Sequence, residues 1–110
     1  MNFTEKDNYI IIEDKNVDVA TFATQLSQSH SDFEKDNVVV NVLDKGNLEA
    51  KDLLVFLEIS DIHKRNKRSF IIASNPLSVE TLPDDLIIAP TLREAEDIVN
   101  MEELERELGF

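Results

Sequence analysis

Two short runs of apolar, mostly β-branched residues constrain the fold of this chain more than any other feature. They are Val38 to Leu43, read VVVNVL, and Phe70 to Ala73, read FIIA. Such runs are typical of strands that are covered on both faces of a sheet. Between them, Leu48 to Lys64 shows one broad apolar face at helical spacing, with Asn47 as the expected cap. Strand, helix and strand in this order predict a βαβ unit.

The segments on either side of this unit supply the other expected elements. The turn residues Lys6, Asp7 and Asn8 favour a hairpin at the start of the chain, and Asn16 or Asp18 can cap the helix that follows. We expect strands at Asn2–Glu5, Tyr9–Glu13 and Leu86–Ala89, and helices at Val17–His30 and from the capping box Thr91–Glu94 onward. The sequence therefore predicts an α/β fold, with a mixed sheet of four to five strands and three to four helices mainly on one face.

The last helix carries two apolar stripes. Leu92, Ala95 and Val99 form the first, and Met101, Leu104 and Leu108 form the second. At about 100° per residue, the mean directions of the two sets differ by roughly 180°. One straight helix cannot bury both stripes against one sheet. We therefore expect a break or bend near Asn100, or a tail whose stripe faces away from the domain.

This reasoning divides the chain into a domain at residues 1–100 and an acidic amphipathic tail at residues 101–110. Two interpretations of the tail stay open. It either folds back on its own core, or its stripe docks on another chain, which includes a dimer through the tail. The oligomeric state does not follow from the sequence.

The charge of the chain narrows the class of partner. There are 23 acidic and 11 basic residues, for a net charge of −12, while 42 % of the residues are hydrophobic. This composition suits one folded domain whose surface would be repelled by nucleic acid or an anionic membrane. The chain has no cysteine, MNFTEKDNY has no signal-peptide pattern, and the apolar runs are too short to span a bilayer. We expect a cytoplasmic protein.

The sequence offers little for metal or cofactor chemistry. His30 and His63 are its only histidines, and neither has a second ligand at helical spacing, so we interpret both as surface residues. The acidic residues of the last helix suit a solvated surface, with Glu102 and Arg106 as an i, i+4 pair. The chain contains two glycines and neither a Gly-x-Ser-x-Gly motif nor a phosphate-binding loop. We expect no metal, no cofactor and no enzymatic activity.

Two charged segments are candidate binding surfaces. The first is the loop and helix start after the first apolar strand, with Asp44, Lys45, Glu49, Lys51 and Asp52. Loops of this kind often carry recognition, so we interpret it as a docking surface, the alternative being a plain solvated loop. The second is the basic cluster His63, Lys64, Arg65, Lys67 and Arg68. It either complements the dipole of the preceding helix or binds RNA phosphate or an acidic partner.

The layout of NYIIIED, VVVNVLD, SFIIAS and DLIIAPT with the closing helix TLREAEDIV resembles the STAS domain. That family includes bacterial anti-sigma-factor antagonists and the cytoplasmic tails of sulfate transporters. The resemblance covers about residues 1–100 and implies a protein-interaction and regulatory role. In the antagonists, a serine at the loop-to-helix junction is phosphorylated. Here Ala50 and Lys51 stand at the serine positions, so the resemblance implies the fold without the phosphoserine switch.

The ending PTLREAEDIVNMEELERELGF also resembles that of small bacterial STAS-like proteins, some of which carry the name ribonuclease Z. The nuclease of that name needs a His-x-His-x-Asp-His metal motif, which this chain lacks. The name would therefore reflect genomic association and not catalysis. The resemblance implies a non-enzymatic interaction domain with a protein partner or, as the alternative, an accessory of tRNA 3′-processing ribonuclease Z.

Overall fold

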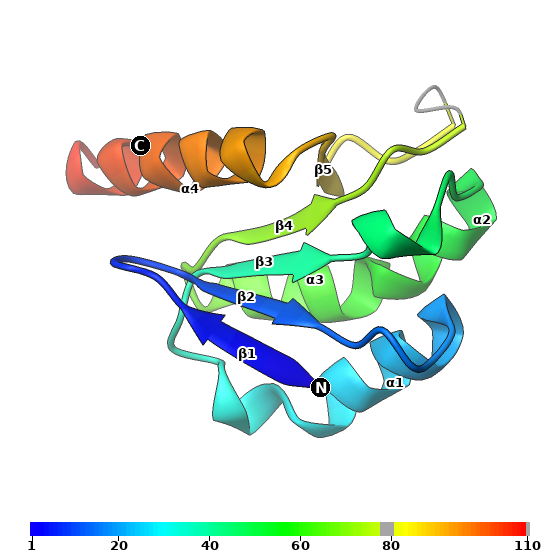
Figure 1. Ribbon diagram of the computed structural model, residues 1–110. Helices are drawn as coiled ribbons and strands as arrows, with labels where there is room; N and C mark the ends of the chain where they lie inside the picture. The colour runs from blue at the N-terminus through cyan, green and yellow to red at the C-terminus, as the bar shows by residue number, and fades with distance from the viewer. Residues whose placement is uncertain (78–80, 110) are drawn as a thin grey trace.

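A five-stranded mixed sheet forms the centre of the computed structural model, which describes residues 1–77 and 81–109 (Figure 1). The strands follow chain order across the sheet: β1 (Asn2–Glu5), β2 (Ile10–Glu13), β3 (Val38–Asn41), β4 (Phe70–Ala73) and β5 (Ile87–Ala89). β1 is antiparallel to β2, and β2 to β5 are parallel to one another. The predicted α/β class and mixed sheet are confirmed.

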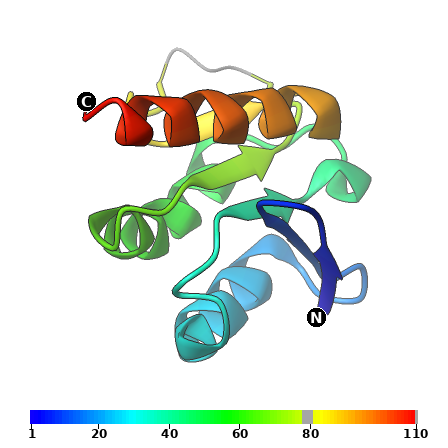
Figure 2. The same cartoon turned by 90° about the vertical axis from the view of Figure 1, so that its left-hand side faces the viewer.

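Helices cover both faces of this sheet. They are α1 (Val19–Gln28), α2 (Ala50–Leu53), α3 (Leu57–Arg65) and α4 (Leu92–Glu107). Figure 2 shows α4 across one face and earlier helices on the other. The buried side chains of α1, α2 and α3 belong to one core and those of α4 to the other, so three of the four helices lie on one side. In the described part of the chain, none of the helices has both the length and the apolar character needed to cross a membrane.

Alternating side chains of the central strands build two separate cores. Val38 and Val40 of β3 point into the larger core with Phe22 of α1, and Val39 points into the smaller core with Val99 of α4. All three valines are fully buried. A strand that is buried on both faces reads as a continuous apolar run, which is why VVV could be recognised in the sequence.

The predicted break in the last helix is wrong. α4 continues through Asn100 as one helix of 16 residues from Leu92 to Glu107. Ala95 and Val99 are buried against the sheet, while the second stripe faces solvent. The tail therefore does not fold back on the core, and the second expectation, a stripe that faces away from the domain, is confirmed. Phe110, which the predicted tail includes, lies outside the described residues.

The single helix predicted over Leu48–Lys64 is interrupted. A short 3-10 segment, η3 (Leu54–Phe56), separates α2 from α3. Leu53 and Phe56 on either side of this segment are fully buried, whereas Leu54 and Val55 are 39 % and 40 % exposed. The tighter winding of a 3-10 turn shifts the direction of successive side chains, so Leu54 is partly exposed although it lies within the predicted apolar helix.

Tyr9 gives a direct test of the smaller core. Its hydroxyl donates to Glu96 Oε1 of α4 at 3.1 Å, and burial, followed by this carboxylate, raises its pKa to about 12. Tyr9 is the only tyrosine of the chain. We expect the absorbance of tyrosinate to appear with a midpoint near pH 12. The contribution of Tyr9 to the stability of the fold should be complete below about pH 10 and should be lost as the pH rises from 10 to 12. A midpoint at the ordinary value of 10 in folded protein would contradict this packing, and Glu96→Gln should lower the midpoint.

Candidate functional site

The loop after β3 is held in one conformation by a lysine. The chain leaves β3 through a 3-10 turn, η2 (Leu43–Lys45), and passes Gly46 at a φ of 79°, which favours glycine. The Lys45 ammonium donates to the backbone oxygens of Asp14 at 2.7 Å and Val17 at 2.6 Å. Lys45 therefore ties this loop to the segment before α1, and it does not project outward as a docking residue.

The start of α2 is closed by two acidic residues. Glu49 is the cap, and its side chain accepts from the backbone N–H of Asp52, while Asp52 Oδ2 accepts from the backbone N–H of Glu49 at 3.0 Å. Such a reciprocal box satisfies two N–H groups that a helix start leaves unpaired. The prediction of Asn47 as the cap is wrong, because the helix begins two residues later. Glu49 and Asp52 thus serve the local fold.

The outward part of this region is a small mixed surface, which we call the junction ridge. It consists of Lys51, Leu54 and Val55, and it lies near the carboxyl ends of the parallel strands (Figure 1). Lys51 is largely exposed and pairs only loosely with Glu49 at 3.5 Å. Asp44 is also exposed in the preceding turn. Of the five residues predicted for this surface, Asp44 and Lys51 point outward. Lys45 bonds to the segment before α1, and Glu49 and Asp52 bond to each other's backbone.

The predicted basic cluster loses one member. The prediction of His63 as a surface residue is wrong, since its side chain is fully buried. Lys64 donates to the backbone oxygen of Asp85, and Arg65 donates to that of Asp61 at 3.4 Å. Lys67 and Arg68 are exposed. Binding of RNA by this cluster stays a prediction, and it now depends on the four remaining cations at the end of α3, which are Lys64, Arg65, Lys67 and Arg68.

The two histidines, both interpreted from the sequence as surface residues, contact each other. His30 Nε2 lies 2.9 Å from His63 Nδ1, and His63 Nε2 lies 2.7 Å from the backbone oxygen of Asp36. A carbonyl only accepts, so His63 Nε2 must carry the proton, and Nδ1 must accept from His30 in the neutral ring. Phe33 and Phe70 pack around the His63 ring. The pair therefore links the end of α1 to α3 inside the core.

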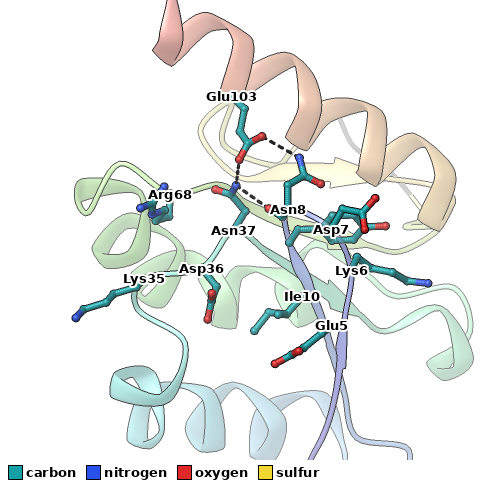
Figure 3. A pocket seen from close by; sticks show the side chains of 11 residues that line it. Glu5, Lys6, Asp7, Asn8, Ile10, Lys35, Asp36, Asn37, Arg68 and Glu103 are labelled. Atoms are coloured by element: carbon teal, nitrogen blue, oxygen red, sulfur yellow. Dashed lines mark hydrogen bonds between the residues drawn. The ribbon is translucent and has the colours of Figure 1, made fainter.

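A polar network connects α4 to the amino ends of three parallel strands. Its centre is Asn37, immediately before β3 and 3 % exposed. Asn37 Oδ1 accepts from the backbone N–H of Ser69 at 2.9 Å and from Arg106 at 3.1 Å. Its Nδ2 donates to the backbone oxygen of Asn8 at 3.0 Å and to Glu103 at 2.8 Å (Figure 3). All the bonding capacity of this buried amide is used.

A recess of about 360 Å³ lies beside this network, at the amino end of the sheet. Figure 3 shows the cations Lys6, Lys35 and Arg68 around it together with several carboxylates. The mixed charges give no clear preference for an anion or a cation. Within residues 1–77 and 81–109, no group of three or more histidine, aspartate or glutamate side chains could hold a metal ion.

Comparisons with known proteins leave the family unassigned. No protein-family model matches this chain, and no curated protein is significantly similar in sequence. The STAS resemblance therefore continues to rest on the segments from which it was inferred.

Proposed function

We propose that this chain is a non-enzymatic, STAS-like domain that binds another protein through the junction ridge. The observation that carries the proposal is the contrast within this region. The loop and helix start are fixed by Lys45 and by the Glu49–Asp52 box, while Leu54 and Val55 are exposed beside Lys51. Apolar side chains with a charged rim on a fixed backbone are typical of surfaces that recognise proteins.

The bonding of the polar groups supports binding rather than catalysis. A catalytic base or nucleophile needs a side chain that can reach a substrate. Lys45 is occupied by two backbone oxygens, and Glu49 and Asp52 are occupied by each other's backbone N–H groups. The strands also follow chain order, whereas open α/β sheets bind small ligands where the strand order reverses. A regulatory interaction domain needs neither a catalytic side chain that can reach a substrate nor a reversal of the strand order.

The test compares partners captured from lysate of the source organism by immobilised wild type and by two double variants. Lys51→Glu/Leu54→Asp alters the junction ridge, and Lys35→Glu/Leu77→Asp makes the same changes at exposed positions outside the ridge. Surface changes of this kind cost about 0.5 kcal/mol of stability or less, which circular dichroism would verify. We expect a partner retained by wild type and the second variant and lost by the first. Equal capture by both variants would contradict the proposal.

A further inference from the structure

The outward face of the C-terminal half of α4 is apolar. Met101, Leu104 and Leu108, which we call the α4 stripe, are 55 %, 55 % and 64 % exposed. Single exposed apolar residues are common on protein surfaces, but these three follow one another at i, i+3 and i+7 on one helical face. They contribute little to either core of the domain, so the stability of the fold does not explain them.

The opposite face of the same two turns fixes the direction of the stripe. Glu102 accepts from the Ser69 hydroxyl at 2.6 Å, and Arg106 donates to the same hydroxyl oxygen at 3.2 Å. Glu103 accepts from the side-chain amides of Asn8 at 2.9 Å and Asn37 at 2.8 Å. These bonds hold the inner face of the helix against the amino ends of the strands. The α4 stripe is therefore presented outward on a fixed helix.

The charges around the α4 stripe have one dominant sign. At about 100° per residue, Glu94, Asp97 and Glu105 lie within about 70° of the centre of the stripe, and all three are exposed. Exposed Arg93 lies within the same range, so the rim carries three carboxylates and one cation. A partner that covers the stripe must therefore pack against apolar side chains and also neutralise a carboxylate rim.

We propose that the α4 stripe binds a cationic amphipathic helix of another protein. Such a helix lays its apolar face against the three side chains and places lysine or arginine beside Glu94, Asp97 and Glu105. A second copy of this chain fits less well, because pairing two stripes brings together two acidic rims on chains of net charge −12. The stripe spans about 10 Å of helix, which suits a transient complex with a Kd in the micromolar range.

This inference is independent of the junction ridge, which lies at the other end of the parallel strands (Figure 1). The probe is a synthetic peptide of about four helical turns, with leucines on one face and lysines elsewhere, and a matched peptide in which glutamate replaces each lysine. Amide chemical shifts of the folded protein would be followed during titration with each peptide. We expect the lysine peptide to bind with its largest shifts between residues 97 and 109, and the glutamate peptide not to bind.

Two variants separate binding at the stripe from general attraction to an acidic surface. Leu104→Ser/Leu108→Ser should weaken binding of the lysine peptide by roughly 10- to 100-fold, whereas Leu77→Ser, at a leucine of equal 64 % exposure, should leave it unchanged. Shifts outside α4, or equal affinities for the two variants, would overturn the proposal. A concentration-dependent dimer in sedimentation that Leu104→Ser/Leu108→Ser abolishes would also overturn it, with a second copy as the occupant.

Discussion

Replacing Asn37 by leucine is expected to lower the free energy of unfolding by about 3 kcal/mol. Leucine has the same branched shape and the same number of heavy side-chain atoms, but it makes none of the four side-chain bonds of this buried amide. The backbone N–H of Ser69, the carboxylate of Glu103 and the guanidinium of Arg106 would each lose a partner. Unsatisfied buried groups, and charged ones in particular, carry a larger cost than the net gain of an ordinary hydrogen bond.

Urea unfolding measures this loss of stability, and amide hydrogen exchange shows which part of the fold is destabilised. The variant should exchange faster at the amides of residues 102–108, because Glu103 and Arg106 hold that half of α4 to the strands. Asn47→Leu, at an exposed asparagine, is the matched control and should change stability by about 0.5 kcal/mol or less. A loss below about 1 kcal/mol for Asn37→Leu would mean that the network contributes little.

His63 is expected to make the protein acid-sensitive. Burial lowers the pKa of its imidazole from 6.5 to about 4, against the smaller opposing effect of the Asp36 carbonyl, which favours the charged ring. A lowered folded-state pKa means that the unfolded chain binds a proton first as the pH falls. The neutral imidazole of His63 therefore makes its full contribution to the free energy of unfolding above about pH 6.5, and this contribution is lost as the pH falls toward 4. The expected loss is about 2 to 3 kcal/mol, at up to about 1.4 kcal/mol per pH unit.

Comparison with His63→Phe isolates this effect from the titration of carboxylates. Phenylalanine preserves an aromatic ring next to Phe33 and Phe70 but leaves the Asp36 oxygen without its side-chain donor. The variant should be less stable at pH 7, and its stability should fall less steeply between pH 6.5 and 4. Equal slopes for the two proteins would show that His63 does not titrate as a buried group. Imidazole nitrogen shifts at neutral pH should report a proton on Nε2 of His63.

The elements that the sequence predicted well are those with a local signal. The βαβ unit is predictable because VVV and FIIA are apolar on both faces. Of the two caps predicted for α1, Asn16 or Asp18, it is Asp18 whose side chain accepts from the Thr21 N–H, at 2.8 Å. Thr91 caps α4 in the same way. In contrast, the expected break near Asn100 assumed that every apolar stripe must be buried in its own domain. The C-terminal half of α4 is instead held on the domain by hydrogen bonds from its polar residues to the amino ends of the strands, while its apolar stripe stays exposed.

The residues that sequence reasoning missed depend on contacts between distant segments. Asn37 lies 66 positions from Glu103, and no local sequence pattern predicts the hydrogen bond between them. One regularity was available, because a polar residue directly precedes both β3 and β4, at Asn37 and Ser69. His63 was assigned to the surface because Lys64 and Arg65 follow it. Phe56, Ile59 and His63 stand at i, i+3 and i+7, which places His63 on the apolar face of the helix, and that signal could have corrected the assignment.

The central claim is that the junction ridge binds another protein, and site-specific photo-cross-linking in cells of the source organism tests it most directly. A photoreactive residue would replace Lys51 in one variant and Lys35, at the amino end of the sheet, in another. The account predicts a discrete protein adduct from position 51, which Leu54→Asp in the same chain removes, and no such adduct from position 35. The same adducts from both positions, or none from position 51 in cells where the protein is abundant, would contradict it.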